Sequence, residues 1–253
     1  MDEKNKYTGM DILDLAQMAP ESVFDEARKI LETLVGYKEL RMMYACALKE
    51  VRTKFEVLDV EFNVRYSRNP INAIHTRLKS NQSILEKMQR RRIPFSLENL
   101  ETRIQDVAGV RVICSYMDDI YRLSEALLRQ DDVKLIAQKD YIQQPKPNGY
   151  RSLHLIVRVP VFFADQRRDL PVEVQIRTIA MDFWASLEHQ LKYKQNVPEQ
   201  EAIVKQLRHC AQRVSDLDEE MLAIRRRIEA AEDKPSEDDI LLEKLMRLET
   251  PLE

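Results

Sequence analysis

The chain has 253 residues, and its 40 Lys and Arg nearly balance 43 Asp and Glu, which leaves a formal net charge of −3. Overall charge therefore gives no argument for nucleic-acid or membrane binding. No run of about 18 apolar residues occurs, so we expect no membrane-spanning helix, and the charged first residues predict no signal peptide. The three cysteines form no CxxC pair and are expected to be reduced thiols in a cytoplasmic protein.

Glycine is scarce, with only four residues, at positions 9, 36, 109 and 149. This scarcity excludes a GxxxxGK[ST] phosphate loop and a GxGxxG dinucleotide turn. A phosphate ligand would have to be bound by side chains and a helix end.

Along the chain, residues 1–20 predict a flexible tail and residues 21–62 a helical segment whose apolar phase resets after Gly36. The middle of the chain then changes character. Runs of β-branched residues alternate with helical stretches, with strands predicted at 71–79, 107–115, 133–139, 152–160 and 170–178 and helices at about 80–91 and 118–129. The sequence predicts an α/β (α+β) core, a mixed five-stranded sheet flanked by helices, with long helical N- and C-terminal extensions.

The C-terminal extension, residues 196–253, is predicted to be helical. From Ile203 to Ile228 apolar residues recur at alternating steps of four and three, the pattern of a helix packed lengthwise on another helix. The partner helix could belong to the same chain or to another subunit, so a role in oligomerisation stays open. After a polar break, a last amphipathic helix is expected at 237–248.

Three of the predicted strands alternate between an apolar face and a polar face. The polar sets are Glu173, Gln175 and Arg177; Tyr150, Ser152 and His154; and His75, Arg77 and Lys79. For any single strand, a solvated face of an antiparallel sheet is the simpler interpretation. Together, however, a carboxylate, cations, an amide, an imidazole and an aromatic ring indicate a specific binding surface.

Two neighbouring segments extend this surface. Ser80 or Asn81 can cap the helix that follows Lys79, and Ser83 and Lys87 lie one turn apart near its start, a pattern typical of an anion site. The segment 146–152 contains an Asn-Gly pair, which by itself predicts a hairpin turn. Because prolines bracket this loop and no alternating strand precedes it, it can instead present Tyr150 for stacking on a base.

Four ordered blocks carry a family resemblance: 76–87, 105–111, 148–154 and 172–178, with 181–189 also fitting. They resemble the synthetase domain of the RelA/SpoT-type alarmone enzymes, closest to the stand-alone small synthetases of bacteria, over about residues 21–231. The resemblance implies a nucleotidyltransferase-like synthetase core at 63–195. It also implies transfer of the β,γ-pyrophosphate of ATP to the 3′-hydroxyl of GDP or GTP, which makes ppGpp or pppGpp in the stringent response and releases AMP.

The resemblance also implies roles for individual residues. For ATP these are Arg77 and Arg111 around adenine and Lys79, Ser83 and Lys87 on the phosphates. For the guanine nucleotide they are Tyr150 as the stacking ring, with Lys139, Lys146, Asn148, His154 and Gln175 around it. Asp106 and Glu173 are implied to bind Mg²⁺, and Glu173 also to assist the attacking hydroxyl. Strict alternation would place Asp106 on the face opposite Arg111, so we expect it in a turn at the strand's entrance.

No adjacent His-Asp pair occurs, so we expect synthesis without the hydrolase activity of the longer relatives. The resemblance further implies a homo-oligomer, with a tetramer favoured, and possible regulation by pppGpp or RNA. Three alternatives remain: a nucleotidyltransferase that attacks the α-phosphate, a non-catalytic nucleotide or RNA sensor, and a helical scaffold with a vestigial core. The carboxylates at both Asp106 and Glu173 argue against the sensor.

Overall fold

A computed structural model of the chain describes residues 21–66, 68–192, 200–231, 240–241 and 245. The predicted tail at 1–20 and nearly all of the helix predicted at 237–248 lie outside these residues. In chain order the elements are α2 (Glu21–Tyr66), β1 (Ile71–Leu78), α3 (Asn81–Arg90), α4 (Leu97–Arg103), β2 (Ala108–Cys114), α5 (Met117–Leu128), β3 (Lys134–Asp140), β4 (Leu153–Phe162), β5 (Arg167–Thr178), α6 (Ile179–Lys192) and α7 (Gln200–Ala231).

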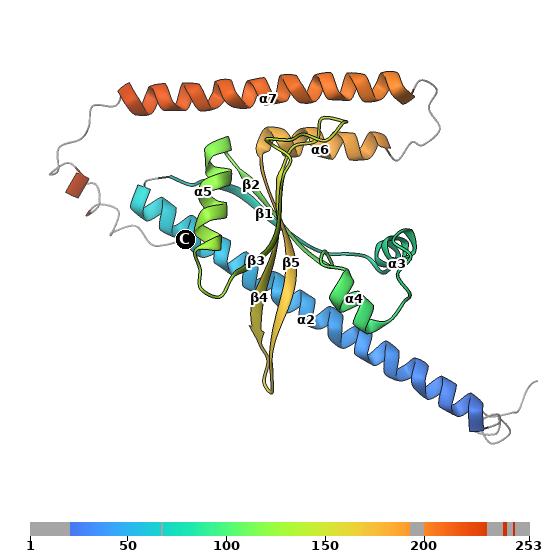
Figure 1. Ribbon diagram of the computed structural model, residues 1–253. Coiled ribbons are helices and arrows are strands. Elements are labelled where there is room, and N and C mark those ends of the chain that lie inside the picture. Colours follow the sequence, from blue (N-terminus) through green and yellow to red (C-terminus); the bar gives the residue numbers. More distant parts are fainter. Residues whose placement is uncertain (1–20, 67, 193–199, 232–239, 242–244, 246–253) are drawn as a thin grey trace, which may run out of the picture.

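The five strands form one sheet in the order β1-β2-β5-β4-β3 (Figure 1). Only β2 and β5 are parallel, and the other three pairs are antiparallel. The predicted mixed five-stranded sheet is therefore confirmed. Helices α4 and α6 were not predicted as elements, because α4 is only seven residues long and α6 follows β5 without an intervening turn.

One face of the sheet is buried beneath helices. The apolar residues of β5, Val172, Val174 and Ile176, are fully buried, and so are Leu153 and Leu155 of β4. Helix α2 contacts β1, β2, β4 and β5, and α5 contacts β2 and β5, so these helices cover the apolar face. This burial leaves the opposite, polar face of the sheet available for chemistry.

Helix α2 runs through Gly36 without a break and ends four residues beyond the predicted segment. Before Gly36 the apolar side chains are exposed, as at Phe24 and Leu31, whereas Tyr44 and Phe55 are fully buried. The reset in phase therefore marks the point where the helix reaches the sheet; the earlier part projects beyond it (Figure 1).

The seam predicted on α7 does not form a single buried face. The buried residues of α7 each directly follow a position of the predicted seam; they are Ala211, Ser215, Asp218 and Leu222. Leu217, Met221, Ile224 and Ile228, which belong to the predicted seam, are about half exposed. Apolar periodicity does not reveal this inner stripe, because two of its members are a serine and an aspartate, and Asp218 accepts a hydrogen bond from Thr178. Within the described part of the chain, no helix is long and apolar enough to cross a membrane.

Candidate active site

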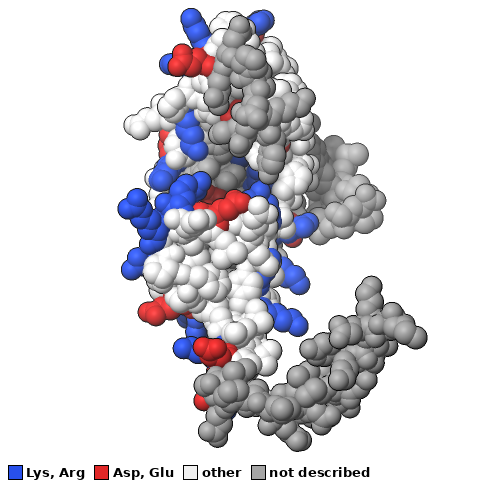
Figure 2. All heavy atoms as spheres, turned by 90° about the vertical axis from the view of Figure 1, so that its right-hand side faces the viewer, with Lys and Arg blue, Asp and Glu red and all other residues white. Residues whose placement is uncertain are grey.

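The polar face of the sheet gathers most of the predicted site residues. Directly paired residues share a face, and the pairing gives one row across all five strands: His75, Arg111, Gln175, His154 and Lys139. The adjacent row contains Arg77, Gly109 and Glu173. Seen from the side of α3 and α4, Lys and Arg side chains surround acidic ones at a hollow in the surface (Figure 2).

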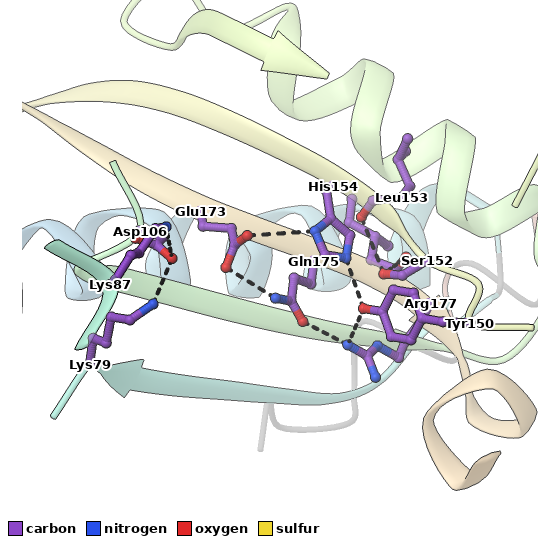
Figure 3. A network of polar contacts seen from close by, with 11 residues as sticks. Lys79, Lys87, Asp106, Tyr150, Ser152, Leu153, His154, Glu173, Gln175 and Arg177 are labelled. Carbon is purple, nitrogen blue, oxygen red and sulfur yellow. Dashed lines mark hydrogen bonds and ion pairs between the residues drawn. The ribbon is translucent and has the colours of Figure 1, made fainter. Parts of the chain in front are cut away.

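A compact ionic cluster lies at one end of this face, and we call it the donor cluster: Lys79, Lys87 and Asp106. Asp106 Oδ2 lies 2.7 Å from Lys79 Nζ and 2.6 Å from Lys87 Nζ (Figure 3). Burial alone would raise the pKa of Asp106, but the two ammonium groups outweigh it and hold the pKa below its usual range. The pKa of Lys87 is lowered, chiefly by burial and also by the nearby charges of Lys79 and Arg91, although Asp106 acts to raise it.

Local structure explains how these three side chains meet. Lys79 directly follows β1, and its N–H donates to Val107 O at 2.8 Å, which ties the end of β1 to the start of β2. Ser80 is the N-cap of α3, and its Oγ accepts from the Ser83 N–H at 3.2 Å. Asp106 lies in the turn before β2, outside the alternation of the strand.

Glu173 lies next to the donor cluster and has partners of its own. Its Oε2 accepts a hydrogen bond from Gln175 Nε2 at 3.0 Å, and its Oε1 lies 3.5 Å from His154 Nδ1. Burial raises the pKa of Glu173, but the contacts with His154 and Gln175 outweigh burial and hold the pKa below its usual range. The negative charge of Asp106 also acts on Glu173, so the two carboxylates lie within electrostatic reach of each other (Figure 3).

A hydrogen-bonded network, which we call the acceptor network, continues from Glu173 through His154, Gln175, Arg177 and Tyr150. Tyr150 Oη lies 2.8 Å from His154 Nε2 and accepts from Arg177 Nη2 at 3.0 Å. Arg177 Nη2 also donates to Gln175 Oε1 at 2.6 Å. Arg177 is almost fully buried, so its hydrogen bonds hold Tyr150 and Gln175 from the interior of the protein.

The ammonium group of Lys146 lies over the ring of Tyr150. Lys146 Nζ lies 4.6 Å from the centroid of that ring and 4.5 Å from the centroid of the Tyr141 ring. Tyr141 also meets His154 edge-on at 5.2 Å. A base stacking on the same face of Tyr150 would therefore have to replace the Lys146 ammonium.

Asp182 connects Arg111 to Arg177 of the acceptor network. Arg111 Nη1 donates to Asp182 Oδ1 at 3.3 Å, and Arg177 Nη1 approaches the same oxygen at 3.4 Å. Arg77 is exposed and diagonal to Arg111 on the neighbouring strand, a spacing of roughly 7–8 Å between backbones.

The structure does not bring every predicted residue to the nucleotide face. Ser152 was expected there and is instead fully buried, because β4 begins only at Leu153 and Ser152 Oγ donates to Ile176 O. Asn148 shapes the loop: its Oδ1 accepts from the Tyr150 N–H, and its Nδ2 donates to Glu188.

Three residues of the site received no role from the sequence. Arg177 was already placed on the polar face by alternation, which was the available signal. Tyr141 and Asp182 carried no comparable signal, because one lies in a turn and the other in the first turn of α6.

Comparison with known proteins decides the family. Residues 76–198 match the family model described as "Region found in RelA / SpoT proteins". GTP pyrophosphokinase YwaC of Bacillus subtilis is 40% identical over 205 residues, which cover 81% of this chain and 96% of the relative. The chain belongs to the RelA/SpoT family.

Solved structures place this RelA/SpoT protein with the small alarmone synthetases. The crystal structure of small alarmone synthetase 2 from Bacillus subtilis matches with a TM-score of 0.68 at 42% identity, covering 76% of this chain and 98% of that one. Small alarmone synthetase 1 from the same organism, bound to its product pppGpp, matches with a TM-score of 0.69 at 37% identity, covering 76% and 97%. The family resemblance expected from the sequence blocks is confirmed.

The carboxylates of this RelA/SpoT protein fit a divalent cation that is held partly by substrate. Asp106 Oδ1 is buried and has no hydrogen-bond partner, so a lone pair remains for a ligand. No group of three or more potential metal ligands occurs among the described residues. Mg²⁺ is commonly bound through one or two carboxylates plus phosphate oxygens, and Asp106 with Glu173 supplies that number.

Proposed function

We propose that the chain is a GTP pyrophosphokinase. It transfers the β,γ-pyrophosphate of ATP to the 3′-oxygen of GDP or GTP, makes ppGpp or pppGpp for the stringent response, and releases AMP. The observation that supports this proposal most directly is that the donor cluster lies next to Glu173, at one end of the acceptor network. The chain is also about 40% identical to proteins named GTP pyrophosphokinase.

The acceptor side performs the nucleophilic step. A ribose hydroxyl is a weak nucleophile, and Glu173, held as a carboxylate by its lowered pKa, takes its proton as the 3′-oxygen attacks the β-phosphorus. The bond from the β-phosphorus to the oxygen shared with the α-phosphate breaks, and AMP leaves with that oxygen. His154 and Gln175 hold Glu173 in place through the contacts at its two oxygens.

The donor side stabilises charge. Lys79 and Lys87 contact Asp106 and lie where they can also neutralise the β- and γ-phosphate oxygens. Mg²⁺ bound by Asp106 and Glu173 would supply further positive charge to the transferring phosphates. We assign Arg77 and Arg111 to the adenine ring, and Ser83, close to the capped start of α3, to the phosphates.

The guanine nucleotide is assigned to the other end of the same face. Tyr150 is the stacking ring, and Lys146 moves from that ring to the nucleotide's phosphates when the base binds. We assign Lys139, which is paired with His154 in the sheet, to the same phosphates. His154 and Gln175 contact the ribose side, and Asn148 keeps the loop in shape.

We further propose that the synthetase core spans residues 63–195, that hydrolase activity is lacking, and that the enzyme works in the cytoplasm, where ATP and guanine nucleotides are made. The exposed apolar stripe of α7 and the projecting part of α2 are proposed to build a homotetramer from such chains. Regulation by pppGpp or RNA is part of the proposal, without assigned residues. Leu217→Glu should lower the mass measured by light scattering; an unchanged mass would remove α7 from the interface.

The test of the proposed function uses two samples of ATP, labelled at the α- or the γ-phosphate, with GDP or GTP and Mg²⁺. We expect the γ-label in the guanine product and the α-label in AMP. Release of free pyrophosphate with the α-label in the product would identify a nucleotidyltransferase instead. No turnover with either acceptor would favour a nucleotide sensor.

A further inference from the structure

Helix α7 packs closely against the loop that carries Tyr150, which we call the acceptor loop (residues 146–152). Gly149 has a φ of +94°, and a Cβ added to it would lie 2.5 Å from Ala211 Cβ and 3.2 Å from Arg208 Cα. A cavity of only about 10 Å³ lies between loop and helix, and it is lined by Gly149, Arg151, Trp184 and Ala211 among others. This is about the minimum that one water molecule needs, so the contact is tightly packed.

Arg151 connects the acceptor loop to α7 by hydrogen bonds. Its Nη1 lies 3.2 Å from Gly149 O and 3.3 Å from Ala211 O, and its Nη2 donates to Gln212 Oε1 at 2.9 Å. A guanidinium presents its donors in a rigid planar fork, so one side chain fixes both backbones at once. Arg151 is therefore engaged with α7, whereas the adjacent Tyr150 is engaged with the acceptor network.

Helix α7 is anchored at two further points near the same site. Thr178 Oγ1 donates to Asp218 Oδ2 at 2.5 Å, and Thr178 directly follows Arg177 of the acceptor network. Trp184 Nε1 donates to Leu207 O at 3.0 Å. The inner face of α7 thus contacts the acceptor loop, the end of β5 and helix α6, beside which it runs in Figure 1. Its outer apolar stripe stays exposed.

We propose that Arg151 is a positioning residue through which α7 holds the acceptor loop in the shape that presents Tyr150 to the guanine nucleotide. The proposal rests on the proposed function, because it names the element that tunes acceptor binding at that site. Since Arg151 makes no contact with the donor cluster in the structure, its loss affects the acceptor nucleotide and leaves ATP binding unchanged.

The kinetic test compares Arg151→Ala with Arg151→Lys and with the control Arg213→Ala, which removes an exposed arginine from α7. We expect Arg151→Ala to raise the KM for GDP and GTP about tenfold or more, because hydrogen bonds to a charged group are lost. The KM for ATP should change less than twofold. Arg151→Lys should recover part of the loss, and Arg213→Ala should behave as wild type.

A steric test addresses the same contact without changing Arg151. Gly149→Ala should raise the acceptor KM, because the new methyl overlaps Ala211 Cβ and the residue keeps a positive φ. Combining it with Ala211→Gly should recover part of the loss, since the overlapping methyl is removed. Equal acceptor KM values for the single and double variants would overturn the role of this contact.

A binding measurement separates this inference from the proposed function. Trp184 is the only tryptophan, and it contacts α7, so its emission reports how α7 is seated without any turnover. Titration with GDP should give a higher dissociation constant for Arg151→Ala than for Arg213→Ala. Equal constants, or an equal rise in the KM for ATP, would overturn the proposal. A wild-type chain that binds GDP but makes no product would refute the proposed function and leave the inference standing.

Discussion

The donor cluster and the acceptor network lie on one sheet face but are built differently. In the donor cluster, three ionic side chains meet directly at 2.6–2.7 Å and come from the end of a strand, one helix and one turn. In the acceptor network, a tyrosine, a histidine, a glutamine and an arginine share hydrogen bonds, and the tyrosine stands on a loop held by a distant helix.

This difference indicates which substitutions should impair the donor cluster and which should impair the acceptor network. The donor cluster depends on charge, which the sheet and α3 fix in place, so it should respond to substitutions that remove charge and to pH. The acceptor network depends on the position of a ring and a loop, so it should respond to substitutions that change shape. The following predictions separate these two kinds of dependence.

The largest effect is expected at the junction of the two halves. Glu173→Gln keeps the shape of the side chain but removes the base, so kcat should fall about 10²–10⁴-fold. ATP binding, measured by calorimetry, should stay within a few-fold of wild type, because the lysines of the donor cluster remain. Turnover equal to that of wild type would remove Glu173 from the mechanism.

A smaller but still large effect is expected from Lys87→Met, which preserves the length of the side chain and removes its charge. Loss of one preorganised charge donor to the transferring group typically costs about 10²-fold in kcat, and the KM for ATP should also rise. The KM for GDP should not change. An equal rise in both KM values would mean that the donor cluster and the acceptor network are not separable.

On the acceptor side, Tyr150→Ala should raise the KM for GDP and GTP by about tenfold or more, because base–aromatic stacking is worth about 1–3 kcal/mol. Tyr150→Phe retains the ring and loses only the hydroxyl contacts with His154 and Arg177, so its effect should be smaller. Steady-state kinetics with each acceptor provides the measurement. A larger loss in the Phe variant than in the Ala variant would contradict the stacking role.

The smallest expected effect is a shift in the pH profile of kcat/KM for ATP. Because burial lowers the pKa of Lys87, its charge is lost at a lower pH than that of an ordinary lysine, and activity should fall as pH rises through this pKa. Lys87→Arg, which stays protonated, should move this basic limb upward. On the acid side, the lowered pKa values of Asp106 and Glu173 should preserve activity until pH falls below their usual range. An unmoved basic limb in Lys87→Arg would exclude Lys87 as its cause.

Much of the fold was predictable because strand alternation is a local signal. The five strands and the polar face of β5, from Glu173 to Arg177, follow from the order of apolar and polar residues. The start of α3 follows from its two candidate cap residues, Ser80 and Asn81, and the structure shows Ser80 as the cap. These features depend on neighbouring residues, and so the sequence contains them directly.

The rest depends on contacts between residues far apart in the chain. The burial of Ser152 reflects the point where β4 begins to pair, and the inner stripe of α7 is defined by Asp218 meeting Thr178. Asp182 belongs to the site because Arg111 and Arg177, from neighbouring strands, both donate hydrogen bonds to it. The periodicity of apolar residues does not predict such contacts, because in the sequence each partner is simply one polar residue among many.

The central claim is that Asp106 and Glu173 serve one metal ion between ATP and the guanine nucleotide. The most direct measurement is anomalous diffraction from crystals of the protein with Mn²⁺, a non-hydrolysable ATP analogue and GDP. We predict an anomalous peak within about 2.0–2.3 Å of a carboxylate oxygen from each of the two residues, as expected for a small divalent ion. A bound analogue whose ion contacts neither carboxylate would contradict the account.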